Sequence, residues 1–541
     1  MLGRREPQRS FFDSQSLPHR VPPDSFYGRM GAVSDVLFRD DDLDMMYCPD
    51  NGRPSIPPSL LSGVTLLQHH DNVSDAEAVE RTMFDQRWKV ALDLPVDFAG
   101  FDPSTLSNFR SRLVEHGQER YAFSRFIAVG REAGFIPDRV TLLTDTTNAK
   151  GAGAVQDTYT LLRQGTRKLL KAAGFALPGK RQGLSPQTRD LVERYVDQDR
   201  KADIDWSDPQ QRLAHLQVLV ADVDAALELA IEHSDDDEVR HLAWLLTKIL
   251  GDDLETDEQG QVQIAEGTAP DRIISLTEPE MRHGRKSKAH RFDGFKVVVS
   301  TEQSSEMILD IADVTASGSD GAHLLPTIQR TEAEADIVVE RVIGDGAFGS
   351  GENRAACDDY PDHAVDLVSP VAQPADPDVH KSAFEIDLEA ETATCPQGHT
   401  VSGQAGPQQN GRPTRLFTFP RATCEACPLF ERCVRSKTTG RTVRTGPYEA
   451  ELQAARLRQQ TEEFDTLYRI RPAVERKIGE LVRHGLRDTR YVGEPQRQLQ
   501  RLWLGAAVNL KRLFTLAQAQ NVDLQALLSR LGPRQVGLMT A

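Results

Sequence analysis

The sequence predicts an α/β fold in which a mixed sheet is interrupted by a helical and a cysteine-rich insertion. Short apolar runs rich in β-branched residues predict strands at 140–145, 295–300, 307–314, 337–344 and 365–368. A helical pattern over about 321–334 separates two of these runs, as a crossover helix does in an α/β sheet. Longer helical patterns lie before residue 135, between 158 and 266, and after Glu449.

The first region, residues 1–135, is predicted to be a helical N-terminal domain. A helix is expected to begin at Pro57, because proline is favoured in a first helical turn. Ser74 and Glu77 form a capping-box pattern that opens a second helix, and a third helix is expected over 105–116. Short helices of this kind are compatible with a DNA-binding domain and equally with any other helical bundle.

The order of strands and helices predicts a core with two insertions. The chain has 541 residues, enough for roughly three or four domains. The first part of the core is expected at 136–156 and 267–370, an acidic helical insertion at 157–266, a cysteine-rich insertion at 371–445, and a helical C-terminal part of the core at 446–541.

The charge is distributed unevenly along the chain. The formal net charge is −17, which excludes a uniformly basic nucleic-acid-binding protein but allows a local basic face. Residues 197–258 hold 18 acidic and five basic side chains, which suits a solvated helical insertion. An acidic gate that mimics or repels nucleic acid is the alternative. Segments 282–296 and 468–512 are basic and can contact phosphates, although a solvated helix face explains the second equally well.

Composition excludes several protein classes. No apolar run approaches the roughly 18 residues of a membrane span, so no membrane association is expected. No apolar core follows the basic residues near Met1, so no secretory signal is expected. Six cysteines are too few for a disulfide scaffold, which makes the cytoplasm the expected compartment. Cys48 and Cys357 are expected to be isolated core thiols.

Three carboxylates are candidates for a metal site. Asp145 and Asp345 each directly follow a predicted strand, and the ligand crevice of an α/β sheet lies at strand ends. Carboxylate oxygens suit Mg²⁺, and two such ions about 4 Å apart can act on a phosphodiester. Glu475, in an arginine-rich helical stretch, is the candidate third ligand. The structural alternatives are a turn or cap for each aspartate, and an ion pair with Arg471 or Arg476 for Glu475.

Four of the six cysteines fall close together: Cys395, Cys424, Cys427 and Cys433. The two-residue gap in Cys424-x-x-Cys427 lets both thiolates reach one ion, and the other two cysteines can complete a tetrahedral Zn²⁺ site. His399 could replace one thiolate. Reduced core thiols and a redox Cys-x-x-Cys pair are the alternatives. The preferred interpretation is a structural, zinc-ribbon-like insertion that lacks an apolar core of its own.

Several motifs, taken in order, resemble the bacterial insertion-sequence transposases of the DDE type, in particular the family of insertion sequence eleven-eighty-two. The matching pieces span nearly the whole chain: Pro57–Leu67, Phe101–Val114, Thr144–Lys150, Thr277–Arg285, Phe292–Lys296, Gly344–Ser350 and Ala507–Leu513. The resemblance implies an RNase H-like core in which Asp145, Asp345 and Glu475 hold two Mg²⁺ (or Mn²⁺) ions.

The same resemblance implies residues that contact DNA. A Tyr-x-x-Arg-x-x-x-Glu pattern is met here by Tyr468, Arg471 and Glu475. In related transposases a lysine lies seven residues after that glutamate, whereas this chain has Val482 there and Arg483 next. The residues expected to hold phosphates are Tyr468, Arg471, Arg483, Lys286 and Lys288.

The function expected from the resemblance is that of a DNA transposase. It would bind terminal inverted repeats, cleave DNA at the ends of the element, and transfer the freed 3′-hydroxyl to target DNA. A homodimer is expected when two ends are held together, in a bacterial cytoplasm in association with the nucleoid. The rival hypotheses are a catalytically inactive, zinc-containing DNA-binding protein derived from a transposase, and an RNase H-like nuclease.

Overall fold

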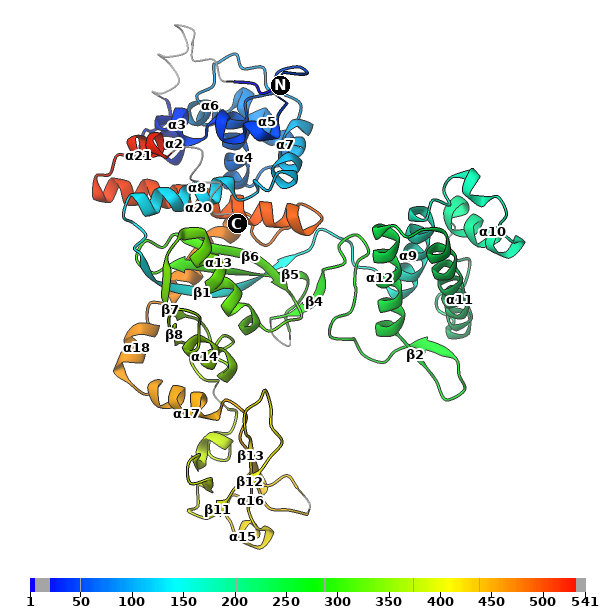
Figure 1. Cartoon of the computed structure of the whole chain (residues 1–541), viewed down its shortest axis with the longest axis vertical. Coiled ribbons are helices and arrows are strands. Elements are labelled where there is room, and N and C mark those ends of the chain that lie inside the picture. Colours follow the sequence, from blue (N-terminus) through cyan, green and yellow to red (C-terminus); the bar gives the residue numbers. More distant parts are fainter. Residues whose placement is uncertain are drawn as a thin grey trace.

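A mixed sheet lies at the centre of the molecule (Figure 1). The computed structural model describes residues 1–4, 20–48, 50–199, 202–286, 289–372, 374–436 and 438–531. The six strands of the sheet are β1 (Arg139–Lys150), β4 (Arg282–Arg285), β5 (Arg291–Glu302), β6 (Ile308–Thr315), β7 (Val338–Ile343) and β8 (Asp366–Val368). The five predicted strands are all present, and the α/β prediction is confirmed.

The strand order places β1 in the middle of the sheet. One edge of β1 pairs with β5 in the antiparallel sense, and the other pairs with β7 in the parallel sense. The far edge of β5 pairs with β4 at its start and with β6 along the rest, while β8 pairs with β7 in the parallel sense. Helix α13 (Leu324–Ala335) crosses over from β6 to β7. This topology is compatible with the RNase H-like core that the resemblance implies.

Strand β1 is longer than the sequence pattern predicts. The prediction that it ends at Asp145 is wrong, because the strand continues to Lys150, and Asp145 lies within it opposite Val299 of β5. The apolar pattern stops early because β7 pairs with β1 only as far as Leu143, so the second half of β1 has a strand neighbour on one side only. Gly294 of β5 permits the close approach at the end of β1, since it has a φ of +149° and a Cβ there would meet a backbone oxygen at 2.3 Å.

Helices from both ends of the chain cover the sheet. The N-terminal helices are α2 (Phe26–Ala32), α3 (Ser34–Leu37), α4 (Pro58–Asp71), α5 (Asp75–Phe84), α6 (Gln86–Leu92), α7 (Ser104–Glu115) and α8 (Tyr121–Glu132). The predicted start of α5 is confirmed, because Ser74 Oγ accepts a hydrogen bond of 3.2 Å from the backbone N–H of Glu77. Helix α20 (Glu494–Gln520) packs against α4, α7, α8 and β6. One apolar core therefore includes the N-terminal helices, the sheet and the C-terminal helices.

The acidic insertion forms an arm beside the sheet (Figure 1). It contains α9 (Thr158–Ala172), α10 (Pro186–Val192), α11 (Pro209–His233), α12 (Asp237–Asp253) and a hairpin of β2 (Leu254–Thr256) and β3 (Val262–Ile264). The helices were predicted, but the expectation that the helical region extends to about residue 266 is wrong, because residues 254–264 form the hairpin. Leu162, Leu219 and Leu246 belong to a core cluster separate from that of the sheet.

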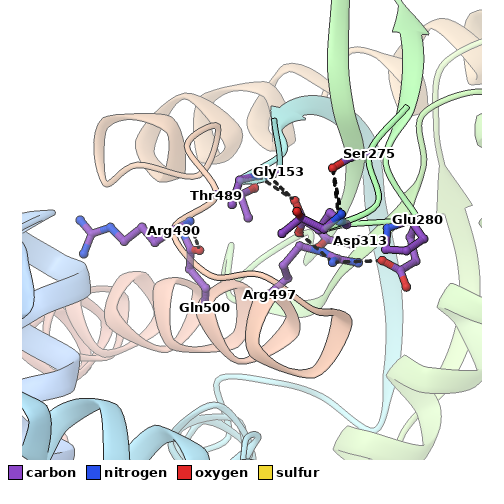
Figure 2. A network of polar contacts seen from close by, with 12 residues as sticks. Gly153, Ser275, Glu280, Asp313, Thr489, Arg490, Arg497 and Gln500 are labelled. Atoms are coloured by element: carbon purple, nitrogen blue, oxygen red, sulfur yellow. Dashed lines mark hydrogen bonds and ion pairs between the residues drawn. The ribbon is translucent and has the colours of Figure 1, made fainter. Parts of the chain in front are cut away.

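A buried polar network joins the neck of this arm to the core (Figure 2). Glu278, which is fully buried, accepts hydrogen bonds from the backbone N–H groups of Ala152 and Gly153 at 2.8 and 2.9 Å. Its other oxygen accepts from Arg497 Nη1 at 2.9 Å, and Arg497 Nε donates to Asp313 at 3.2 Å. Ala152 lies just after β1, and Glu278 lies just before β4, so they mark the two points at which the chain enters and leaves the arm. The network therefore links both points to α20.

The cysteine-rich insertion forms a separate small unit. Its strands are β9 (Glu385–Asp387), β10 (Thr392–Thr394), β11 (Thr400–Ser402), β12 (Gln404–Ala405), β13 (Arg415–Thr418) and β14 (Thr442–Arg444), with the short helices α15 (Arg421–Glu425) and α16 (Phe430–Cys433). Phe384, Phe417 and Phe419 belong to a buried cluster within it. The expectation that the insertion lacks its own apolar core is therefore wrong: its aromatic residues, although few, pack together between two three-stranded sheets.

The chain returns to the core through α17 (Glu449–Arg458), α18 (Glu462–Tyr468) and α19 (Pro472–Arg483), and α21 (Leu524–Arg530) follows α20. These helices confirm the prediction that the chain is helical from Glu449 onward. Among the described helices, none combines the length and apolar character needed to cross a membrane.

Candidate active site

Two aspartates occupy equivalent positions on neighbouring parallel strands. Leu143 of β1 and Ile343 of β7 are paired in the sheet, and Asp145 and Asp345 each lie two residues further along. The chain leaves β7 just before Asp345, whose Oδ1 accepts a hydrogen bond of 2.9 Å from the N–H of Ala347. The turn predicted as the structural alternative for Asp345 is thus present, and it also fixes the carboxylate beside β1.

Helix α19 brings the third carboxylate to the same place. The helix packs against β1 and β5, and its buried apolar side includes Val474 and Leu481. Arg471, the residue before the helix, donates from Nη1 to Glu475 Oε1 at 2.6 Å and from Nη2 to Asp145 Oδ2 at 2.9 Å. The intrahelical pair predicted as the alternative for Glu475 therefore exists, and the same guanidinium also binds Asp145.

The pKa of Asp145 reflects this clustering. Burial is the largest effect and raises the pKa above its usual value, while the charge of Arg471 and the N–H of Thr146 lower it. The negative charges of Asp345 and Glu475 raise it further, so the net direction is upward. The structure thus brings Asp145, Asp345 and Glu475 within electrostatic reach of one another.

Tyr468 lies beside the same cluster, at the end of α18. Its ring stacks on Phe464 with a centroid distance of 5.5 Å. Burial raises the pKa of Tyr468, Arg471 lowers it, and the three carboxylates raise it. Tyr468 and Arg471 are therefore the two predicted DNA-contacting residues that the structure brings to the carboxylates.

The remaining predicted DNA-contacting residues lie at the surface or beyond the described part. Arg483 is exposed in the last turn of α19, whereas Val482 beside it packs against the core. Lys286 is exposed in the turn between β4 and β5. Lys288 lies outside the described residues. The local sequence thus puts an arginine at the surface, next to the position where related proteins have lysine.

One basic residue near the site did not stand out from its sequence. Arg487 donates from Nε and Nη2 to Thr147 Oγ1 at 3.2 and 3.1 Å, and its carbonyl accepts from the N–H of Lys150 at 2.8 Å. Thr147 is two residues from Asp145 on β1, so both side chains are on one face of the strand. The basic character of 468–512 was the only signal, and it did not distinguish Arg487 from its neighbours.

The three carboxylates do not surround a common point. In the part of the chain that the structure describes, no three His, Cys, Asp or Glu side chains are placed so that they could hold one metal ion. At the carboxylates, the Arg471 guanidinium lies between Asp145 and Glu475. The donor set itself, three carboxylates of which Glu475 is about half exposed, suits a hard cation such as Mg²⁺.

The four clustered cysteines line a single cavity of about 30 Å³. Cys424 Sγ accepts a hydrogen bond from the N–H of Arg441, and Cys427 Sγ accepts one from the N–H of Leu429, each at 3.4 Å. Burial raises the pKa of the Cys433 thiol, Arg441 lowers it, and the three other cysteines of the cluster raise it. His399 also lines this cavity but is exposed. The structure thus brings Cys395, Cys424, Cys427 and Cys433 together.

The two other cysteines differ from each other. Cys357 is buried, as predicted, and burial raises the pKa of its thiol to about 12. The prediction that Cys48 is a core thiol is wrong, because Cys48 is exposed. Met46 is buried and Tyr47 packs against the core, but the chain reaches the surface at Cys48.

Comparison with protein families identifies two parts of the chain. Residues 15–112 match the family described as Transposase domain (DUF772), and residues 394–514 match the family described as Transposase DDE domain. The first match covers most of the N-terminal helices; the second runs from Thr394 through Glu475 into α20. Searches of curated proteins and of solved structures found no match. The chain therefore contains two transposase domains, one of them of the DDE type, which supports an insertion-sequence transposase of the DDE type.

Proposed function

We propose that this transposase binds the terminal inverted repeats of its insertion sequence and catalyses metal-dependent DNA cleavage and strand transfer. The observation that supports this most is that Arg471 binds both Asp145 and Glu475, with the charge of Asp345 acting on Asp145, in a chain with two transposase domains. The three acidic side chains come from widely separated segments, and packing of α19 on β1 brings the last of them to the sheet.

Asp145, Asp345 and Glu475 would hold two Mg²⁺ or Mn²⁺ ions. The ions would supply positive charge to the attacking and leaving oxygens of an in-line displacement. The carboxylates suit this role because oxygen ligands are preferred by both cations. Asp145 is mostly buried and Glu475 is about half exposed, so the site has a protected side and a side open to DNA.

The chemistry consists of two displacements at phosphorus. A water molecule attacks the phosphodiester at the end of the element, and the bond to the 3′-oxygen breaks to free a 3′-hydroxyl. That hydroxyl then attacks a target phosphodiester and displaces its 3′-oxygen. Tyr468 and Arg471 would hold a phosphate at the carboxylates, since donors placed there stabilise the charge of the transition state. Arg483, Lys286 and Lys288 would contact DNA phosphates further away.

We also propose that Cys395, Cys424, Cys427 and Cys433 hold a structural Zn²⁺ ion. The support is that all four line one cavity and that two of the sulfurs accept backbone hydrogen bonds, which favour thiolate ligands. The four thiolates would hold the ion as a closed structural site, which stabilises the fold of the insertion.

The decisive experiment uses Mg²⁺ and DNA that carries the flanking ends of the element. Cleavage at the ends followed by joining to target DNA is the expected result. A plain RNase H-like nuclease would cut without requiring the terminal repeats and without joining. An inactive DNA-binding relative would bind the ends and leave them intact. Cross-linking with two end fragments would report the homodimer expected when two ends are held together.

A further inference from the structure

The Arg471 side chain occupies the space where a cation is needed. Its guanidinium binds Asp145 at 2.9 Å and Glu475 at 2.6 Å, and only 15% of the side chain is exposed. Two carboxylates of a site with three like charges are therefore neutralised by a cation that belongs to the protein itself. The positive charge of Arg471 thereby reduces the electrostatic repulsion among Asp145, Asp345 and Glu475.

The same position of Arg471 is incompatible with divalent ions between these carboxylates. An ion bound to both Asp145 and Glu475 would be in the space of the guanidinium, and like charges repel at such distances. Consistent with this, no three acidic side chains among the described residues are placed to share an ion. The guanidinium therefore has to leave before the carboxylates can close on a metal.

The hydrogen bonding of Arg471 is incomplete in its present position. Its Nε is buried and, in the part of the chain that the structure describes, has no hydrogen-bond partner. A buried donor without a partner is costly, so part of the stabilisation from the two ion pairs is lost. A phosphate can accept two parallel hydrogen bonds from one guanidinium edge, which would satisfy Nε together with one Nη.

We propose that Arg471 is a built-in counter-cation that competes with metal and, once displaced, binds the DNA phosphate. This inference rests on the proposed metal site. Without metal the guanidinium pairs with Asp145 and Glu475. When the metal ions bind, Arg471 is displaced and both its Nε and Nη groups become available to the phosphate. Metal loading and phosphate binding are thereby coupled through a single side chain.

The test is Mn²⁺ binding to the full-length protein without DNA, followed by electron paramagnetic resonance. Arg471→Gln should bind Mn²⁺ at least about tenfold more tightly than the unsubstituted protein, because the competing charge is gone. Arg476→Gln is the matched control. Arg476 is next to Glu475, is 68% exposed and pairs with Glu306 at 3.6 Å, so its loss should change the affinity less than about twofold. Circular dichroism and thermal unfolding would establish that both variants are folded.

Two outcomes would overturn the proposal. Unchanged or weaker Mn²⁺ binding by Arg471→Gln would show that the guanidinium does not compete with metal. Equal tightening in Arg471→Gln and Arg476→Gln would indicate a general effect of charge. The failure of the proposed site itself is distinguished by Asp345→Asn: if this variant binds Mn²⁺ as tightly as the unsubstituted protein, the carboxylates are not the metal site.

Discussion

Arg471 donates a hydrogen bond of 2.9 Å to Asp145, although 326 residues separate the two in the chain. The contact joins the start of α19 to the central strand of the sheet. It places a helix that carries a carboxylate over a strand that carries another. This is the junction at which the candidate active site is assembled.

Asp345→Asn should reduce DNA cleavage by at least about 100-fold, because a neutral amide is a poor ligand for the divalent ions. The fold should change little, since the side-chain oxygen accepts one backbone hydrogen bond, from Ala347, and an amide oxygen can accept it too. The measurements are cleavage of end DNA in Mg²⁺ and the thermal unfolding temperature. Retained cleavage would remove Asp345 from the active site.

Cys427→Ser should lower both the bound zinc and the thermal stability of the protein. A structural zinc site contributes on the order of 10 kcal/mol to the folding of small metal-binding units, and serine is a poor replacement for a thiolate ligand. Metal analysis by mass spectrometry and a thermal melt would report the two effects. Cys48→Ser is the control, because Cys48 is exposed and distant in sequence from the cluster. Unchanged zinc content in Cys427→Ser would refute the site.

Arg497→Met should destabilise the protein by about 3–5 kcal/mol, because Glu278 would remain buried without its charged partner. Arg497 is 2% exposed, and its loss would also break the contact with Asp313. Urea unfolding would measure the change. Arg240→Ala is the control, since that arginine is about half exposed and its ion pairs lie at the surface. A loss below about 1 kcal/mol would show that the neck network contributes little.

The free energy of unfolding should decrease between about pH 4 and pH 2, because Asp71 becomes protonated in this range. Burial alone would raise the pKa of Asp71, but hydrogen bonds from His70, Trp88 and Tyr27 outweigh it and lower the pKa to about 2. Because the folded pKa is below the unfolded one, the stabilisation is fully present above the unfolded pKa and is lost as the pH falls toward 2. The contribution is about 2 kcal/mol.

Asp71→Asn tests this assignment by urea unfolding at several pH values. The variant should be less stable than the unsubstituted protein at pH 7, and the difference should shrink as the pH approaches 2. Asp138→Asn is a suitable control, because the Asp138 side chain is 90% exposed. A difference that does not depend on pH would show that the ionised form of Asp71 is not the stabilising one.

DNA binding should weaken steeply with salt even though the net charge is −17. Counterions are released locally, where basic side chains meet phosphates, and the overall charge does not set the slope. Arg483→Ala should lower the slope of log K against log salt by about one, whereas Arg240→Ala on the acidic arm should leave it unchanged. Fluorescence anisotropy at a series of salt concentrations measures these slopes. A flat salt response would argue against the basic segment as the DNA-binding face.

By itself, the sequence determined local secondary structure and short motifs. Apolar runs and caps predicted five of the six strands of the central sheet and the helical regions, because strand and helix periodicity depend on neighbouring residues. The two-residue gap between Cys424 and Cys427 marked the cysteine cluster for the same reason. Strand β4 and the strands of the two insertions were not predicted. The candidates Asp145, Asp345 and Glu475 could be named from their positions beside apolar strands and from the ordered resemblance.

The tertiary structure decided which distant segments meet. Only strand pairing shows that Asp145 and Asp345 are in register, that β1 continues to Lys150, and that the N-terminal helices share one core with the sheet. The position of Arg471 between two carboxylates depends on how α19 packs on β1. Such contacts arise from burial and pairing between segments hundreds of residues apart. Local periodicity shows which face of a helix or strand is apolar, but it does not show which distant segment packs against that face.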